Sequence, residues 1–364
     1  MEERHDFKFG DRGKYLLFKL EKTGLDTLAV LKISAKHLNV PRKVIGYSGL
    51  KDRYSHSCQY FSVPANMISM PIEAENLDMA GNNMQLNYIG QLEEPLKLGS
   101  HNSNYFKLTI RRMNADTLDL LKSRLPALQE GAPIPNYFDS QKFGYLLGPQ
   151  GFFAGKYLKS EYEDALKLVI ARKNRKERAS SKAVHSFIQA NWKDWKRCSE
   201  FLSEHPFENY LKLTKYLESR PEDYKGAIKL FTPDSLKLKI TSLQAYLWNE
   251  YLKMKMEQLF GATDLTEVKY HVGKLCFIKE LQKASEKLSE PKSLKTLPMP
   301  SPEIGEEHKT VYNELIKRDF GIDSIDDFDK FNELNYRTNA HERNLFFTPT
   351  GLKIEDEGKD EDIL

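Results

Sequence analysis

The first 145 residues of the chain mix strand patterns with helix patterns. Residues 15–20 and 59–63 are short, mostly apolar runs, and each predicts a strand. Phe106, Leu108 and Ile110 alternate with polar side chains, which predicts a third strand. Two helices are predicted from helical spacing: Leu25, Leu28, Leu31, Ala35 and Leu38 before Pro41, and Leu118, Leu121, Leu125 and Leu128 after a cap at Asn114. This mixture is typical of an α+β domain.

The pattern changes near residue 160. From there to about residue 325, the apolar spacing predicts helices separated by short polar breaks. Residues 240–249 belong to one of these helices, and we expect Tyr246 and Trp248 to pack in a core. Residues 291–302 contain four prolines and are expected to form an exposed loop.

The stretch 46–59 carries the most distinctive polar chemistry. Gly46 and Gly49 can adopt positive φ, so residues 43–47 are expected to form a short strand that ends in a tight turn and presents Asp52. The neighbouring cations Lys51 and Arg53 favour the ionised carboxylate and attract a polyanion. Such a carboxylate can act as nucleophile, general base or metal ligand. The alternative is a solvated, charged surface turn.

Net charge, cysteine positions and the lengths of apolar runs indicate what kind of protein this is and in which compartment it folds. The formal net charge of the 364 residues is only +3, so a nucleic-acid surface must come from local clustering of cations. The three cysteines lie far apart in the sequence, fit no zinc spacing and indicate a reducing compartment. No apolar run approaches the roughly 18 residues of a membrane helix, and the first residues lack a signal-peptide core. We therefore expect a cytoplasmic protein with no membrane partner.

The residues around Asp52 resemble a known family motif. Gly49-Leu50-Lys51-Asp52-Arg53, followed by Gln59, is similar to the G-x-K-D-[KR]-x-A-x-T-x-Q signature of the TruD family of tRNA pseudouridine synthases, with serines at the Ala and Thr positions. The resemblance places the catalytic aspartate on Asp52. It also makes Lys51, Arg53 and Gln59 candidates for substrate contacts.

A second motif supports the same resemblance. Residues 135–144, with the sequence PNYFDSQKFG, are similar to the family's P-N-Y-F-G-x-Q-R-F-G. An aromatic ring beside an amide suits a flipped-out uracil, because the ring stacks on the base while the amide reads its edge. Phe138 and Asn136 are the candidates for these roles, and the alternative is that this aromatic pair belongs to the core. Asp139 stands where the family has Gly, and Lys142 where it has Arg.

A basic run provides a candidate RNA-binding surface. Its first four cations are Arg172, Lys173, Arg175 and Lys176, and such a cluster suits contacts with phosphates. A solvated helix end or loop is the alternative.

The resemblance also implies a domain plan. It predicts an α+β fold: a pseudouridine synthase-type catalytic domain with a mixed sheet, interrupted by a mostly helical insertion. The catalytic domain is expected to contain residues 1–158 and 326–364, and the insertion residues 159–325, with the helix around residues 240–252 packing on the catalytic domain. Residues 1–9 are too few for the family's opening strand, and its closing motif has no counterpart, so we expect a truncated C-terminal part with terminal strands missing.

The function implied is isomerisation of uridine 13 of tRNA to pseudouridine by a monomeric enzyme that needs no cofactor or metal. The first alternative is an RNA-binding protein of the same fold with little or no activity, because its terminal strands are missing. A weaker alternative is a helical scaffold in which the Lys51-Asp52-Arg53 run only decorates the surface.

Overall fold

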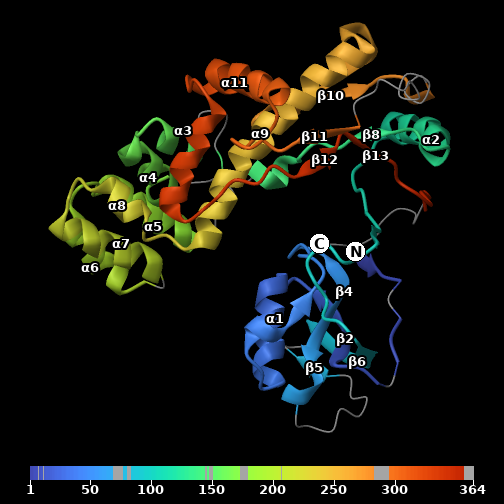
Figure 1. The fold of residues 1–364 in the computed structure, drawn as a ribbon, viewed down its shortest axis with the longest axis horizontal. Coiled ribbons are helices and arrows are strands. Elements are labelled where there is room, and N and C mark those ends of the chain that lie inside the picture. Colours follow the sequence, from blue (N-terminus) through green and yellow to red (C-terminus); the bar gives the residue numbers. More distant parts are fainter. Residues whose placement is uncertain are drawn as a thin grey trace. The chain divides into compact units, whose positions relative to one another are not determined.

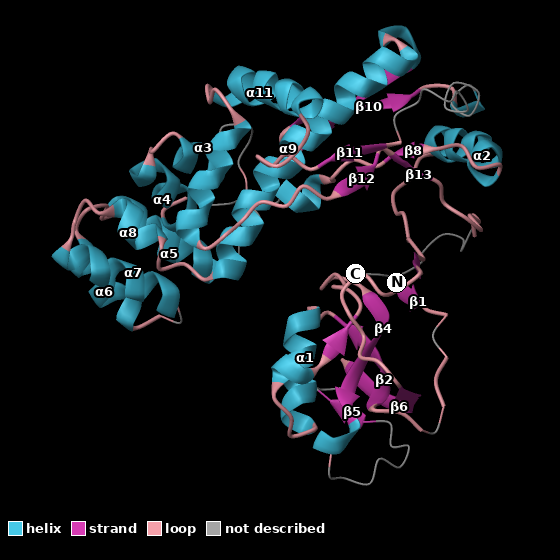
Figure 2. Cartoon of the chain, viewed as in Figure 1, coloured by secondary structure: helices cyan, strands magenta, loops and turns pink. Residues whose placement is uncertain are grey.

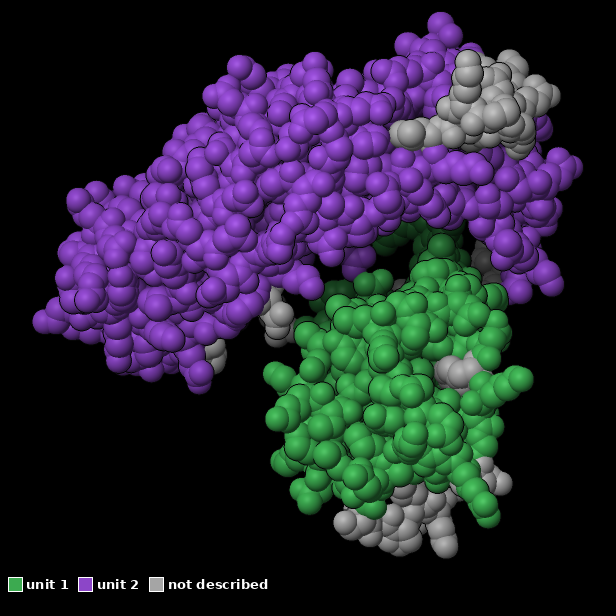
Figure 3. Space-filling model, in the orientation of Figure 1, with its two compact units in different colours: residues 1–113 green, residues 114–364 purple. Residues whose placement is uncertain are grey.

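The computed structural model describes residues 1–6, 8–10, 12–68, 77–79, 83–143, 146, 151–172, 179–205, 207–282 and 295–355. The chain divides into two compact units, Met1–Met113 and Asn114–Leu364, which are coloured separately in Figure 3. This boundary differs from the three-part division into catalytic domain and insertion, which stays a prediction. The fold is a mixture of helices and strands with a mixed sheet, as expected (Figure 1).

Unit 1 is built on a mixed sheet. Its described strands are β1 (Glu2–Arg4), β2 (Tyr15–Thr23), β3 (Gly46–Tyr47), β4 (His56–Pro64), β5 (Leu77–Met79), β6 (Met84–Leu92) and β7 (Ser103–Tyr105). Their order is β5-β6-β2-β4-β1-β7, and β3 pairs with β4. The pairing of β1 with β4 is parallel, whereas β2 and β4 pair antiparallel. The strands predicted at residues 15–20 and 59–63 are confirmed as parts of β2 and β4.

One helix, α1 (Thr27–His37), packs against this sheet (Figure 2). Its buried Val30 and Leu31 belong to the same core cluster as Phe18 of β2 and Phe61 of β4. The side chain of Asp26 accepts a hydrogen bond from the backbone N–H of Ala29 and caps the helix. The predicted helix is therefore confirmed. Leu31 and Ala35 of its predicted stripe lie in the core of unit 1, whereas Leu28 is exposed.

Residues 2–4 form the three-residue strand β1, and the expectation that residues 1–9 are too few for the family's longer opening strand stays a prediction. One sequence expectation about unit 1 is wrong. The alternation at residues 106–110 does not form a strand: Phe106, Leu108 and Ile110 are exposed by 55%, 77% and 62%. Alternation favours a strand only where a partner strand is available, and the partner of β7 is the three-residue β1.

Unit 2 is mostly helical. Its described helices are α2 (Ala115–Gln129), α3 (Phe153–Leu158), α4 (Tyr162–Ile170), α5 (Ala179–Ala190), α6 (Trp195–Ser203), α7 (Glu208–Ser219), α8 (Tyr224–Ile228), α9 (Pro233–Phe260) and α11 (Glu306–Phe320). The strands in the same described residues are β8 (Ile134–Pro135), β9 (Leu265–Tyr270), β10 (Gly273–Ile278), β11 (Thr296–Pro298), β12 (Glu342–Asn344) and β13 (Phe346–Phe347). The prediction that residues 160–325 are all helical is wrong, because they contain the hairpin β9–β10. Charged residues on the exposed face of the hairpin interrupt the apolar pattern that would predict strands.

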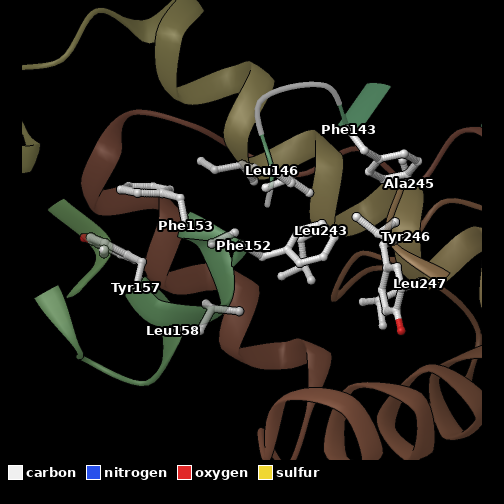
Figure 4. Close-up of a cluster of buried hydrophobic side chains, with 14 of the residues drawn as sticks. Phe143, Leu146, Phe152, Phe153, Tyr157, Leu158, Leu243, Ala245, Tyr246 and Leu247 are labelled. Atoms are coloured by element: carbon white, nitrogen blue, oxygen red, sulfur yellow. The ribbon is translucent and has the colours of Figure 1, made fainter. Parts of the chain in front are cut away.

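The core of unit 2 surrounds α9. Leu243, Tyr246 and Leu247 of this helix lie in one cluster with Phe143 and Phe152 (Figure 4). Trp248 is completely buried and donates its ring N–H to the carbonyl of Leu297. The packing expected for Tyr246 and Trp248 is therefore confirmed.

The proline-rich stretch differs from its prediction. Leu297 and Met299 are buried, because β11 pairs with β12, so residues 296–299 are not an exposed loop. Residues 291–294 lie outside the described part of the chain.

Candidate active site

Asp52 lies on the exposed loop between β3 and β4. Hydrogen bonds from two other side chains hold its backbone carbonyl in place. The ammonium of Lys22, on β2, donates hydrogen bonds to the carbonyls of Leu25 and Asp52, each at 2.8 Å. The hydroxyl of Ser55 donates to the same carbonyl of Asp52 at 2.9 Å. Burial lowers the pKa of Lys22, and the negative charge of Asp52 opposes this shift. The loop therefore presents Asp52 to solvent on an anchored backbone.

The glycines before Asp52 act differently from the expectation. Neither Gly46 nor Gly49 is among the described glycines with positive φ. A side chain at Gly46 would place its Cβ 2.4 Å from the carbonyl oxygen of Leu96. Gly46 is therefore needed for a close backbone approach and not for a left-handed turn.

Lys51 points into unit 1 and away from the surface. Its ammonium lies 2.8 Å from Glu3 Oε1, with 2% and 0% of the two side chains exposed. It also donates to Asn104 Oδ1 at 2.7 Å. The second oxygen of Glu3 accepts from the backbone N–H of Tyr60 at 3.1 Å and lies 3.3 Å from His5 Nε2. The charge expected to flank Asp52 at the surface is thus neutralised inside the fold.

Gln59 is also completely buried. The hydroxyl of Thr27 accepts a hydrogen bond from the backbone N–H of Lys51 at 2.8 Å and lies 3.1 Å from Gln59 Oε1. Among the described residues, Gln59 Nε2 has no hydrogen-bond partner. Gln59 and Thr27 therefore connect β4 and α1 to the backbone next to Asp52.

The sequence neighbours Leu50, Arg53 and Tyr54 are exposed near Asp52. Arg53 Nε donates to the carbonyl of Gly24 at 3.2 Å, and its guanidinium lies 5.8 Å from the ring centre of Tyr54. Tyr54 is 91% exposed and Leu50 is 62% exposed. Sequence reasoning missed Tyr54, although its position two residues after Asp52 and directly after Arg53 was a usable signal.

Asn136 lies in unit 2, directly after β8. Its side-chain N–H group donates to the carbonyl of Asn344 at 2.9 Å, and its backbone N–H donates to Leu345 at 2.7 Å. Arg343 Nη2 donates to both the side-chain and the backbone oxygen of Asn136, each at 2.8 Å. The orientation of the Asn136 amide is therefore set by the β12 region.

Phe138 is half-buried beside the same arginine. Its ring meets the Trp248 ring edge-on, with ring centres 5.7 Å apart, and Arg343 Cζ lies 4.1 Å from the Phe138 ring centre. The buried side chain of Asn249 accepts from the backbone N–H of Phe138 and donates to its carbonyl, each at 2.8 Å. Asn249 was missed as a site residue, although it ends the stretch 240–249 that was predicted to be helical.

The structure thus gives two groups of candidates. Asp52, Lys51, Arg53 and Gln59 belong to unit 1, whereas Asn136 and Phe138 belong to unit 2.

The basic run is only partly described. Arg172 is half-buried, with its guanidinium against Gly151, and burial lowers its pKa. Lys173, Arg175 and Lys176 lie outside the described residues. The RNA-binding role of this run stays a prediction.

The other hollows and reactive side chains in the described part of the chain are weaker candidates for an active site. A hollow of about 410 Å³ is lined by five carboxylates, which disfavour an RNA backbone: Glu161, Glu163, Asp164, Glu222 and Asp223. Burial raises the pKa of Cys58 and Cys198 to about 11, so these thiols are poor nucleophiles. No group of His, Cys, Asp and Glu in the described residues has the arrangement of a metal site. None of the described helices has the length and apolarity to cross a bilayer.

Comparison with known proteins gives one consistent result. The family model for tRNA pseudouridine synthase D (TruD) matches residues 1–296. The probable tRNA pseudouridine synthase D 2 of Methanocaldococcus jannaschii is 30% identical over 363 residues, covering 99% of this chain and 82% of that protein. The tRNA pseudouridine synthase D of Aquifex aeolicus is 29% identical over 248 residues, covering 66% and 60% of the two chains.

A solved structure has a similar fold. The crystal structure described as a TruD from Methanosarcina mazei superimposes with a TM-score of 0.59 at 22% identity, covering 94% of this chain and 81% of that one.

Proposed function

The chain belongs to the TruD family of tRNA pseudouridine synthases, and from this premise we propose that it isomerises uridine 13 of tRNA to pseudouridine, with Asp52 as the catalytic carboxylate. One observation carries the proposal. Asp52 stands within the family's G-x-K-D-R motif, exposed to solvent, while buried Lys22 holds its backbone in place. Membership of the family indicates the reaction, and the anchored, accessible carboxylate of Asp52 is a group that can perform it.

The reaction exchanges one bond for another. The bond between N1 of uracil and C1′ of the ribose breaks, a bond between C5 and C1′ forms, the proton on C5 leaves and N1 gains one. The exchange is redox-neutral. Asp52 can attack the base or the sugar, or remove a sugar proton, and each of these steps needs an ionised carboxylate with free approach.

The other candidates receive supporting roles. We assign Phe138 to stacking on the extruded uracil and Asn136 to reading its edge, which the fixed amide supports. Arg53 is assigned to a contact with the RNA beside Asp52. We assign Lys51 and Gln59 the role of positioning residues, because both are buried and hold the Asp52 loop through Glu3 and Thr27.

The basic run is assigned to contacts with RNA phosphates; its residues are Arg172, Lys173, Arg175 and Lys176. We further propose that the protein acts in the cytoplasm as a monomer.

The experiment is direct mapping. An unmodified tRNA transcript is incubated with the protein and every pseudouridine is located at nucleotide resolution. The proposal expects pseudouridine at position 13, and modification of another uridine only would contradict the proposed site. Binding without any pseudouridine would instead support the RNA-binding alternative.

A further inference from the structure

We propose that Lys142, Lys237 and Arg343 form a binding site for a backbone phosphate of the RNA beside Phe138. The inference rests on the proposed function, since it assigns the nucleotide whose base stacks on Phe138. To the proposed function it adds a second group of the RNA that the protein would bind, a phosphodiester, and the three residues that would bind it.

Two of the three cations lie next to the Phe138 ring. Arg343 Cζ is 4.1 Å from the ring centre, and Lys142 Nζ is 5.9 Å from it. Lys142 also donates a hydrogen bond to Thr241 Oγ1 at 2.9 Å. Lys237 lies four residues before Thr241 on α9, so the two residues share one face of that helix. Lys142 and Arg343 therefore lie beside the Phe138 ring, and Lys237 lies close enough to Lys142 for their charges to interact.

The charges in this cluster act on one another. Burial lowers the pKa of Lys142, and the positive charges of Lys237 and Arg343 lower it further. Burial also lowers the pKa of Arg343. Holding like charges together in a half-buried place costs free energy, which an incoming anion recovers.

Carboxylates of the described residues do not neutralise this cluster. No ion pair among them involves Lys142, Lys237 or Arg343, and Asp139 forms none with Lys142. Other cations of unit 2 do have such partners: Lys156 pairs with Glu161, and Lys309 pairs with Asp326. Two half-buried cations, Lys142 and Arg343, thus lie beside Phe138 without a carboxylate at ion-pair distance in the described part of the chain.

The chemistry of the cluster favours a phosphate that is attached to a base. A guanidinium and two ammonium groups are typical phosphate ligands. The aromatic ring beside Lys142 and Arg343 suits the base of the same or the next nucleotide, because one sugar separates base from phosphate. A free carboxylate would not use the ring.

The first test measures how tRNA binding depends on salt. The double variant Lys142→Gln/Lys237→Gln is compared with the parent and with Lys255→Gln. Lys255 is a matched control on the same helix α9, since its ammonium lies 5.6 Å from the Tyr251 ring centre. The double variant is expected to weaken binding and to reduce the slope of log affinity against log salt by about 1 per lysine, whereas the control keeps the parent's slope.

The second test identifies the phosphate. Single phosphates on either side of the modified uridine are replaced by neutral methylphosphonates, and affinities are measured for the parent and the double variant. At one position, the replacement should weaken binding by the parent and have little further effect on the double variant. Fully additive losses at every position would overturn the inference.

The outcomes separate the inference from the proposed function. If the parent forms pseudouridine but the double variant and Lys255→Gln show the same salt slope, the phosphate site is wrong and the function stands. If the parent forms no pseudouridine, the proposed function falls, and the salt slopes still decide the phosphate site. A parent that does not bind tRNA would overturn both.

Discussion

The ammonium of Lys51 lies 2.8 Å from the carboxylate of Glu3, and the two side chains are 2% and 0% exposed. The pair joins β1, at the start of the chain, to the residue directly before Asp52. Two buried charges are stable only together, because either one alone would lose its hydration without compensation. The position of the Asp52 loop therefore depends on the first strand of the sheet.

Lys51→Met is expected to destabilise unit 1 by about 3 to 5 kcal/mol, because it leaves Glu3 buried and uncompensated. Hydrogen exchange of the β4 amides measures this effect within unit 1. Lys14→Met is the control, since Lys14 pairs with Glu93 at 3.7 Å with 75% and 71% of the side chains exposed, and such a pair contributes little. Equal protection of β4 in both variants would refute the structural role of Lys51.

Acidification is expected to weaken unit 1 through His5. Burial lowers the pKa of His5 below its ordinary value, and the nearby Glu3 opposes this shift by raising it. Below a pH of about 6.5 the unfolded chain then binds more protons than the folded one, so the stability present at neutral pH is lost as the pH falls through the lowered folded pKa. His5→Asn should flatten this loss in denaturation measured across that range. A parent and a variant with parallel pH dependence would contradict the assignment.

Asn249→Leu is expected to impair the Phe138 site. The change removes both hydrogen bonds to the Phe138 backbone, at a cost of about 1 to 3 kcal/mol for each group left unpaired. Turnover should fall at least about tenfold, because the ring loses its fixed position. Gln244→Leu is the control: Gln244 is a buried amide on the same helix that donates to Pro300. It should lose stability but keep turnover at a temperature where both variants are folded, and equal turnover in the two variants would count against Asn249.

Phe138→Leu separates stacking from packing. Leucine keeps most of the apolar volume against Trp248 but removes the aromatic face, so stability should change by less than about 1.5 kcal/mol. Turnover should fall roughly 10-fold to 100-fold, the equivalent of about 1 to 3 kcal/mol of stacking. Phe138→Tyr should cost much less, since it keeps the ring. A folded Phe138→Leu protein with full turnover would remove the stacking role.

The local elements were largely predictable from the sequence. The runs in β2 and β4, the stripe of α1 and the cap at Asn114 depend on neighbours within a few residues, so periodicity reveals them. The alternation at residues 106–110 failed, because a strand also needs a partner that the local sequence does not specify.

Motifs located the candidate site but not its supports. They identified Asp52 and Phe138 without showing that Lys51 turns inward. The bond between Lys51 and Asn104 spans 53 residues, and the bond between Asn249 and Phe138 spans 111. Spacing cannot predict contacts at such separations, because they form only when the tertiary fold brings the elements together.

The most direct test of the central claim is the pseudouridine content of tRNA after incubation with the parent protein and with Asp52→Asn. The substitution removes one exposed charge and almost no volume, so the melting temperature and the tRNA affinity should match those of the parent. Glu93→Gln, which neutralises another exposed carboxylate of unit 1, is the control and should keep full turnover. The account predicts pseudouridine with the parent and none with Asp52→Asn. Turnover by Asp52→Asn within a few-fold of the parent would contradict it.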